Sequence, residues 1–202
     1  MDFLTPGREG VAHAARLLRA GEVIGFPTDT VYGLAALATH ERAVRRIYEI
    51  KGRSLSQPLV LMIPEPEGLD AWAQVDDRVR AYVRRWWPGP LTLVVRARDG
   101  VGPPLTSAGV PRTIAVRIPD HELALTLLRE AGEALATTSA NRSGEPPALT
   151  PLETAWVEGL AAVLDGGRAP GGVPSTLLDL SGDQPAILRR GPIEPAELLE
   201  PR

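Results

Sequence analysis

The chain has 202 residues, a formal net charge of −3 and no cysteine. Its length suits one domain, and 44% hydrophobic with 23% charged residues is ordinary for a soluble globular protein. The lack of cysteine excludes a disulfide scaffold, a thiol nucleophile and cysteine-based metal sites, and the acidic balance argues against a nucleic-acid binder of the basic kind.

The first half of the chain is predicted to alternate between helices and strands. Apolar residues recur every three to four positions in the helical segments, whereas short β-branched or continuous apolar runs mark the strands. The nearly uninterrupted apolar run at 58–63 predicts a strand buried on both faces. In chain order we predict a helix at 9–20, a strand at 22–26, a helix at 41–50, a strand at 58–63, a helix at 76–87 and a strand at 91–95.

The second half is predicted to be richer in strands. A Gly/Pro-rich loop at 165–174 is long enough to serve as a lid. Together the elements indicate an α/β fold, a single domain with a twisted, mostly mixed β-sheet and flanking helices. Here we predict a strand at 113–118, a helix at 124–131, strands at 134–138, 162–164, 176–180 and 186–188, and a helix from Glu194 onward.

The sequence shows no sign of a membrane or exported protein. No apolar run approaches the roughly 18 residues of a membrane-spanning helix. The segment Met1-Asp2-Phe3 has no basic stretch leading into an apolar one, as a signal peptide would. We therefore expect a cytoplasmic location.

Several common catalytic motifs are missing. The chain has no Gly-x-x-x-x-Gly-Lys-Ser/Thr, no Gly-x-Gly-x-x-Gly and no Gly-x-Ser-x-Gly. Its histidines, His13, His40 and His121, are scattered, so we expect neither a His-rich metal site nor a catalytic triad.

One polar segment, Pro27–Gly33, directly follows the first predicted strand. Thr, Asp and Thr at positions 28 to 30 are residue types that cap helices and fix turns. We interpret Asp29 as a turn residue, the alternative being a contact with a metal ion or an amine.

Lys51 and Arg53 lie at the end of the second predicted helix. Of the 22 basic residues, 21 are arginine, so Lys51 is the only lysine. A compact ammonium beside a forked guanidinium suits a polyphosphate. The alternative is the ordinary preference of basic residues for helix C-termini.

Further segments place hydroxyls and guanidinium groups next to strands. Thr137–Gly144 contains the only asparagine, Asn141, and either binds phosphate or ribose or forms a capped turn. Ser175 precedes a strand, and Arg117 and Arg189 lie at strand ends. This inventory lacks a covalent nucleophile, and it fits the positioning and charge neutralisation on which phosphoryl and nucleotidyl transfer depend.

In this order, from about Gly10 to Gly191, these segments resemble the YrdC family of threonylcarbamoyl-AMP synthases. The residues that carry the resemblance are Pro27-Thr28-Asp29-Thr30-Val31-Tyr32-Gly33-Leu34, Lys51-Gly52-Arg53, Pro58-Leu59, Trp87-Pro88-Gly89-Pro90-Leu91-Thr92, Ala115-Val116-Arg117-Ile118-Pro119, Thr138-Ser139-Ala140-Asn141-Arg142-Ser143-Gly144, Pro174-Ser175-Thr176 and Leu188-Arg189-Arg190-Gly191.

The resemblance implies a single YrdC-like domain over 1–202, with its sheet and helices around a deep basic cavity. It implies a nucleotidyltransferase that condenses L-threonine, bicarbonate or CO₂, and ATP to threonylcarbamoyl-AMP and pyrophosphate, with Mg²⁺ held mainly by the ATP phosphates. The product would pass to a separate transferase complex that modifies tRNA.

Residue by residue, the resemblance also implies two substrate sites. Lys51 and Arg53 would be the catalytic pair, and Arg117 a two-pronged partner of the threonine carboxylate. The implied ATP-binding residues are Lys51, Arg53, Gln57, Thr113, Ser139, Asn141 and Arg189. The implied threonine-binding residues are Thr30, Arg117, Thr137 and Ser175.

The sequence departs from the family pattern at Ser54, Gln57, Met62 and Pro147, which concerns the finer contacts with ATP and threonine. Two alternatives stay open. One is a YciO-type paralogue with the same fold and a different activity on nucleotides. The other is an RNA-binding module, against which the net charge argues because phosphate contacts dominate RNA affinity.

Overall fold

The computed structural model describes residues 1–142 and 144–199. Ser143, which belongs to one of the sequence motifs above, and residues 200–202 lie outside these ranges. No helix in the described ranges is long and apolar enough to cross a membrane.

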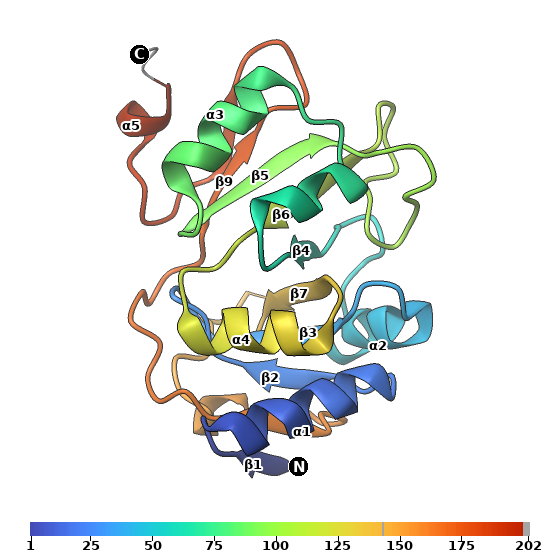
Figure 1. Cartoon of the computed structure of the whole chain (residues 1–202), viewed down its shortest axis with the longest axis vertical. Coiled ribbons are helices and arrows are strands. Elements are labelled where there is room, and N and C mark those ends of the chain that lie inside the picture. The colour runs from blue at the N-terminus through green and yellow to red at the C-terminus, as the bar shows by residue number, and fades with distance from the viewer. Residues whose placement is uncertain (143, 200–202) are drawn as a thin grey trace.

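The described strands join into one sheet that runs along the long axis of the molecule, from β1 at one end to β9 and β10 at the other (Figure 1). Its order is β1-β8-β2-β3-β7-β4-β6-β5-β9-β10. The strands are β1 (Asp2–Leu4), β2 (Ile24–Phe26), β3 (Gly33–Leu37), β4 (Val60–Met62), β5 (Leu91–Arg96), β6 (Thr113–Arg117), β7 (Leu135–Ser139), β8 (Ala162–Leu164), β9 (Thr176–Asp179) and β10 (Ala186–Arg189).

The sheet is mixed, as predicted. The pairs β1–β8, β8–β2, β4–β6 and β5–β9 are parallel, and the other neighbouring strands are antiparallel. The helices are α1 (Arg8–Arg19), α2 (Glu41–Lys51), α3 (Asp77–Trp86), α4 (Glu122–Ala131) and α5 (Pro195–Leu199), with short 3₁₀ helices at Pro66–Ala71 and Leu152–Thr154.

Local chemistry sets the ends of the helices that flank the sheet. The Asp76 carboxylate caps α3 by accepting the Val79 amide at 2.8 Å. Helix α2 ends at Gly52, whose φ of 57° lies in the left-handed region that favours glycine. This turn separates Lys51, the last helical residue, from Arg53.

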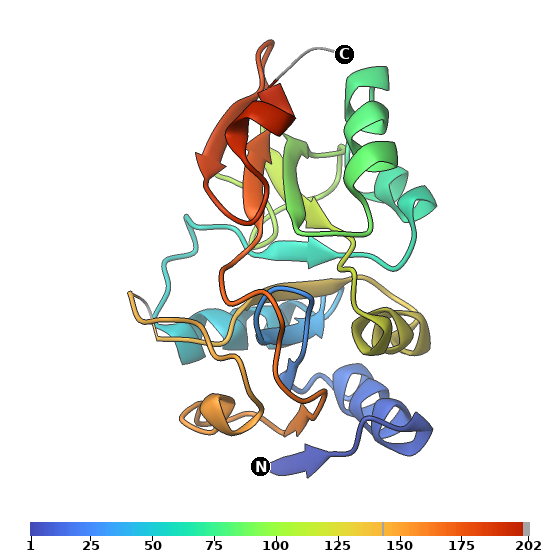
Figure 2. The ribbon, with the colours of Figure 1, turned by 90° about the vertical axis from the view of Figure 1, so that its left-hand side faces the viewer.

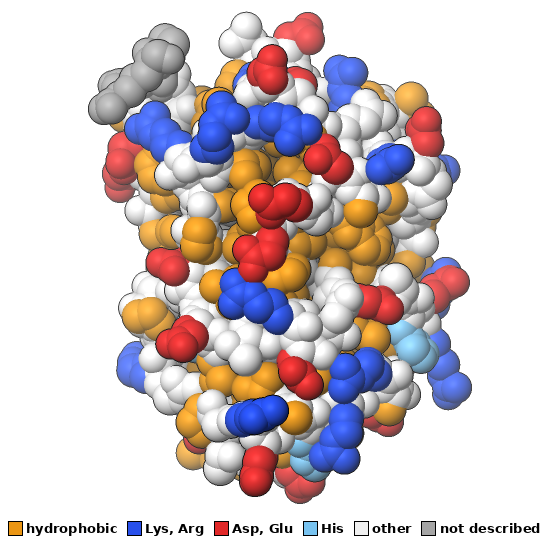
Figure 3. Space-filling view, viewed as in Figure 1, with side chains coloured by type: hydrophobic (Ala, Val, Ile, Leu, Met, Phe, Trp, Pro, Cys, Tyr) orange, Lys and Arg blue, Asp and Glu red, His pale blue; other side chains and the backbone are white. Residues whose placement is uncertain are grey.

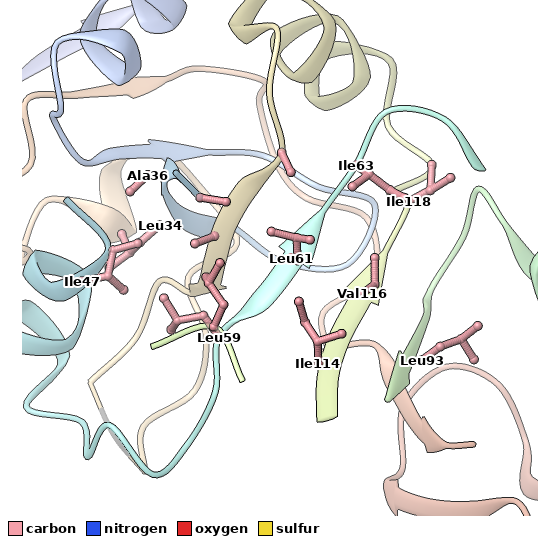
Figure 4. Close-up of a cluster of buried hydrophobic side chains, with 14 of the residues drawn as sticks. Leu34, Ala36, Ile47, Leu59, Leu61, Ile63, Leu93, Ile114, Val116 and Ile118 are labelled. Carbon is pink, nitrogen blue, oxygen red and sulfur yellow. The ribbon is translucent and has the colours of Figure 1, made fainter. Parts of the chain in front are cut away.

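Two apolar clusters hold the helices against the sheet. Helices α1 and α4 lie side by side over one face (Figures 1 and 2), and their apolar stripes pack on strand residues such as Ile24 and Phe26. The larger cluster includes the apolar side chains of α2 and α3, and its strand residues include Leu34, Leu61 and Val116 (Figure 4). Successive strand residues point to opposite faces of the sheet. The residues that alternate with the buried ones of the larger cluster therefore lie on the other face.

The predicted elements agree with the structure, but β1 and β3 were not predicted. Strand β3 has the sequence Gly-Leu-Ala-Ala-Leu, which contains no β-branched residue and favours a helix by propensity. It is a strand because β2 and β7 pair with it on both sides. Strand 58–63 was predicted to be fully buried, yet Val60 is only half-buried because it faces a cavity.

The central strand β4 gives a direct test of this packing. Leu61 is 1% exposed in the larger cluster, so Leu61→Ala should lower the free energy of unfolding by about 2–5 kcal/mol. Chemical denaturation measures this loss. The control is Leu152→Ala, because Leu152 is 73% exposed and its truncation should change stability by less than about 0.5 kcal/mol. Equal losses in both variants would contradict the packing described here.

Candidate functional site

A cavity lies on the sheet face opposite the cluster of Figure 4. Its floor is made of paired strand residues that alternate with the buried apolar ones, because partners in register point to the same face. Val60 pairs with Ala115 on one side and Thr137 on the other, Met62 pairs with Arg117, and Thr92 pairs with Leu177. All of these residues line the cavity.

The floor has two ends. Arg117 is the last residue of β6, and Thr113 is the first, so about 13 Å of strand separates them. The Val60–Thr137 pair lies in the middle of the floor, with the Met62–Arg117 pair on one side of it. On the other side, toward Thr113, the cavity is lined by Arg53, Pro58 and Ser139. We call these the Arg117 end and the Arg53 end.

At the first end, Arg117 is a buried guanidinium with three protein partners. Its side chain is 3% exposed. Nη2 donates to Oδ1 of Asp29 at 2.6 Å, Nη1 to Oγ1 of Thr30 at 2.9 Å, and Nε to the Gly89 carbonyl at 2.9 Å. A guanidinium has five N–H donors, so one N–H on each terminal nitrogen has no partner among the described residues.

The polar segment after β2 forms the turn that holds Arg117. Thr28 Oγ1 accepts the amides of Thr30 and Val31, both at 3.2 Å, and donates to the Val31 carbonyl at 2.7 Å. Thr28 therefore fixes the turn, and the interpretation of Asp29 as the turn residue is wrong. The Asp29 side chain is 12% exposed and pairs with Arg117 instead.

The loop at 165–174, expected as a lid, is bonded to the cavity wall. Tyr32 Oη donates to the Gly167 carbonyl at 2.7 Å and accepts the Gly166 amide at 3.0 Å. The Gly172 amide donates to the Thr30 carbonyl at 3.0 Å. A Cβ on Gly171 would lie 2.7 Å from the Thr30 Cα, so only glycine fits there. Through these contacts the loop forms the wall behind Thr30 in this structure.

Ser175 joins this wall to Arg189 on β10. Arg189 donates to the Ser175 carbonyl through Nε at 3.1 Å and Nη2 at 3.0 Å, and Nη2 lies 3.2 Å from Ser175 Oγ. The Ser175 hydroxyl is also 2.7 Å from Thr92 Oγ1, in a buried pair. Arg189 therefore reaches the cavity in a fixed position.

At the Arg53 end, the only lysine is bonded to the Ser139–Asn141 segment. Lys51 Nζ donates to the Ser139 carbonyl at 2.8 Å, to Asn141 Oδ1 at 2.9 Å, and to the Asn141 carbonyl. Ser139 Oγ donates to Asn141 Oδ1 at 2.5 Å. Arg53 donates to Thr138 Oγ1 at 3.2 Å and to the Pro58 carbonyl at 3.0 Å. An ammonium has three N–H donors, and all three of Lys51 hold this segment.

Burial changes the acidity of these cations. It lowers the pKa of Lys51 from 10.5 to about 8, and the nearby charge of Arg53 adds to the effect. Burial also lowers the pKa of Arg189, and the positive charges of Arg117 and Arg53 lower it further. The arginines stay charged, so the cavity gathers positive charge that an anionic ligand would neutralise.

The described residues offer no cluster of three His, Asp or Glu side chains that could hold a metal ion. The polar atoms around the cavity are hydroxyls, amides and guanidinium groups. This donor set suits a metal ion that arrives on a phosphate ligand and keeps its other oxygens from that ligand and water.

Most residues singled out from the sequence meet around this cavity. Thr30, Arg53, Arg117, Thr137, Ser139, Ser175 and Arg189 line it, and Lys51 and Asn141 are bonded to its rim. Gln57 is exposed. The Thr113 amide donates to Ser107 Oγ at 2.9 Å. Neither of them lines the cavity.

Sequence reasoning did not single out Thr28, Thr92 and Thr138 as site residues, although they also line the cavity. Thr92 is fully buried in a strand of otherwise apolar residues up to Val95. A lone hydroxyl in such a strand was the available signal, since a buried polar group needs a partner.

Comparison with known proteins agrees with this geometry. Residues 16–191 match the family Sua5_yciO_yrdC, described as "Telomere recombination". A threonylcarbamoyl-AMP synthase of Bacillus subtilis is 41% identical over 195 residues, which cover 95% of this chain and 56% of that protein.

Two solved structures are similar to the whole fold. The structure of P. abyssi Sua5 complexed with L-threonine has a TM-score of 0.87 and 37% identity, covering 94% of this chain and 57% of that chain. E. coli YciO has a TM-score of 0.88 at 24% identity, covering 98% of both chains. The chain spans little more than half the length of the B. subtilis and P. abyssi proteins.

The single lysine makes its environment directly measurable. A sample labelled with ¹³C-lysine should give one side-chain Cε signal, from Lys51. NMR titration should place its midpoint near pH 8, because burial and Arg53 disfavour the charged ammonium. Arg53→Gln should raise the midpoint by removing the neighbouring charge. A midpoint above 10 in the unmodified chain would show that Lys51 is solvated and not bonded to the Ser139–Asn141 segment.

Proposed function

Because the chain belongs to the Sua5–YciO–YrdC family, we propose that it is an L-threonylcarbamoyladenylate synthase, a nucleotidyltransferase acting on ATP. It would condense L-threonine, bicarbonate or CO₂, and ATP to threonylcarbamoyl-AMP and pyrophosphate. The product would serve a transferase complex that modifies tRNA.

One observation carries the proposal: a single cavity presents a buried guanidinium with two unpartnered N–H groups at one end and several cations at the other. The Arg117 end offers two N–H groups of one guanidinium, the group that pairs best with a carboxylate. The Arg53 end combines Arg53, Ser139 and the nearby Lys51, a set that suits phosphates. The cavity lining contains no cysteine, histidine or lysine that could act as a nucleophile.

The proposed chemistry needs no nucleophile from the protein. The threonine ammonium loses one proton, and the resulting amine attacks the carbon of CO₂, which forms the N–C bond and opens one C=O bond; a second N–H proton passes to solvent and leaves the carbamate. A carbamate oxygen then attacks the α-phosphorus of ATP, the bond between the α- and β-phosphates breaks, and pyrophosphate leaves. The protein's contribution is to hold the two reactants in line and to neutralise charge on the phosphates.

The cavity residues divide these tasks. Arg117, Thr30 and Ser175 would orient threonine at one end, with Thr137 on the floor between the ends. Arg53, Ser139 and Arg189 would contact the nucleotide, and Lys51 would keep Ser139 and Asn141 in place through its three hydrogen bonds. Mg²⁺ would enter as part of the ATP complex.

The two alternatives are less well supported. The similarity to YciO, at 24% identity, concerns the fold, whereas the synthase relative reaches 41%. An RNA-binding module would need an extended basic surface. The face in Figure 3 instead mixes positive and negative side chains. On α2, Arg45 and Arg46 are paired with Glu41 and Glu49.

The proposed activity is tested with purified protein, ATP, Mg²⁺, bicarbonate and L-threonine. Pyrophosphate release should require threonine and bicarbonate together, and mass spectrometry should detect threonylcarbamoyl-AMP. Pyrophosphate release at a rate independent of threonine would favour the YciO-type alternative. RNA binding without any turnover would favour the RNA-binding module.

Arg53 gives a residue-level test of the nucleotide end. Arg53→Gln should raise the KM for ATP by at least about tenfold, because a charged hydrogen-bonding group in a sheltered site contributes about 2 kcal/mol or more. The KM for threonine should change by less than about threefold. The matched control is Arg45→Gln, an exposed arginine of α2 that pairs with Glu41. Equal changes in both KM values would remove Arg53 from the nucleotide site.

A further inference from the structure

The cations around the cavity differ in whether a carboxylate compensates their charge. At the Arg117 end, the guanidinium is paired with the Asp29 carboxylate at 2.6 Å, and both side chains are largely buried. Burial lowers the pKa of the nearby His121, although Asp29 opposes the shift, and this disfavours a further positive charge there. The Arg117–Asp29 pair therefore carries no net charge of its own.

The Arg53 end has no such compensation. Arg53 and Lys51 donate only to neutral oxygens of Thr138, Pro58, Ser139 and neighbouring residues. Arg189 lies on the side of the cavity where Thr92 and Ser175 are, and it donates to Ser175. Among the described residues, none of these three cations forms an ion pair with a carboxylate.

The hydroxyl of Thr30 lies beside the free N–H groups of Arg117. Thr28 Oγ1 donates to the Val31 carbonyl and accepts the amides of Thr30 and Val31, so its proton and both of its lone pairs are used. Thr30 Oγ1 accepts one N–H of Arg117, and its second lone pair is available to a ligand.

The Arg117 end thus presents two N–H donors of a charge-compensated guanidinium beside the Thr30 hydroxyl. An α-amino acid is a zwitterion without net charge, with a carboxylate for the donors and an ammonium that a hydroxyl oxygen can accept from. A phosphate carries up to two negative charges and has no ammonium, so it matches the cationic Arg53 end better.

We propose that Asp29 is a specificity-determining residue. By neutralising Arg117, it keeps phosphate groups away from the Arg117 end and leaves that end to a zwitterionic amino acid. The proposal rests on the proposed function for the identity of the amino acid. Asp29 does not line the cavity, and it acts through Arg117.

Without Asp29 the same guanidinium would be an unpaired cation within reach of both substrates. The phosphates of ATP carry more negative charge than the threonine carboxylate, and they would then bind at both ends. Arg117 alone cannot discriminate a carboxylate from a phosphate, because its fork fits both anions.

The test is calorimetric titration with inorganic phosphate and with L-threonine, without turnover. In the unmodified protein, phosphate should bind at the Arg53 end and leave the threonine affinity unchanged. Asp29→Asn removes the negative charge and keeps an oxygen facing Arg117. In this variant a second phosphate should bind at the Arg117 end, with an affinity at least about tenfold higher than that end has in the unmodified protein. Phosphate should now compete with threonine.

Asp29→Asn/Arg117→Gln is the matched control. It removes both charges of the pair, so it should stay folded and show one phosphate and no competition. A purely structural role of Asp29 would weaken threonine binding without adding a phosphate site. Circular dichroism establishes that each variant is folded.

Three results would overturn the inference. One is an unchanged phosphate stoichiometry in folded Asp29→Asn, and another is a second phosphate in the double variant. Should Asp29→Asn not fold, competition between phosphate and threonine in the unmodified protein would overturn it as well. Failure of the unmodified protein to bind threonine would count against the proposed function, while the phosphate stoichiometry would still decide the role of Asp29.

Discussion

Burying the charge of Arg117 is the constraint on which the site depends. A guanidinium that is 3% exposed needs a partner for its charge and for its N–H groups. Those partners come from separate parts of the chain: Asp29 and Thr30 after β2, and the Gly89 carbonyl before β5. Satisfying one side chain therefore joins both halves of the sheet and leaves two N–H groups for a ligand.

The alternation of the strands supplies the rest of the site. The same strands that bury Leu61 and Val116 on one face present Val60, Ala115 and Thr137 to the cavity on the other. A register shift of one residue would exchange the two sets. The positions of the polar side chains are thus set by the apolar packing shown in Figure 4.

Most elements and most site residues were predictable from the sequence, because helices and strands here have clear apolar periods and the polar motifs stand beside strands. The family resemblance of those motifs is confirmed by the match over residues 16–191. Strand β3 could not be predicted, since pairing on both sides overrides the helix propensity of its alanines and leucines. The role of Asp29 could not be predicted either, because its partner lies 88 positions away. Local chemistry pointed to a turn, which Thr28 forms instead.

The central claim is that the cavity separates an amino-acid end, where Asp29 compensates the charge of Arg117, from a phosphate end whose cations are uncompensated. A crystal structure of the unmodified chain with L-threonine and a non-hydrolysable ATP analogue tests it most directly. The account predicts the threonine carboxylate on the terminal nitrogens of Arg117, the Asp29–Arg117 pair intact, and the phosphates near Arg53 and Arg189. A phosphate bound to Arg117, or threonine bound at the Arg53 end, would contradict it.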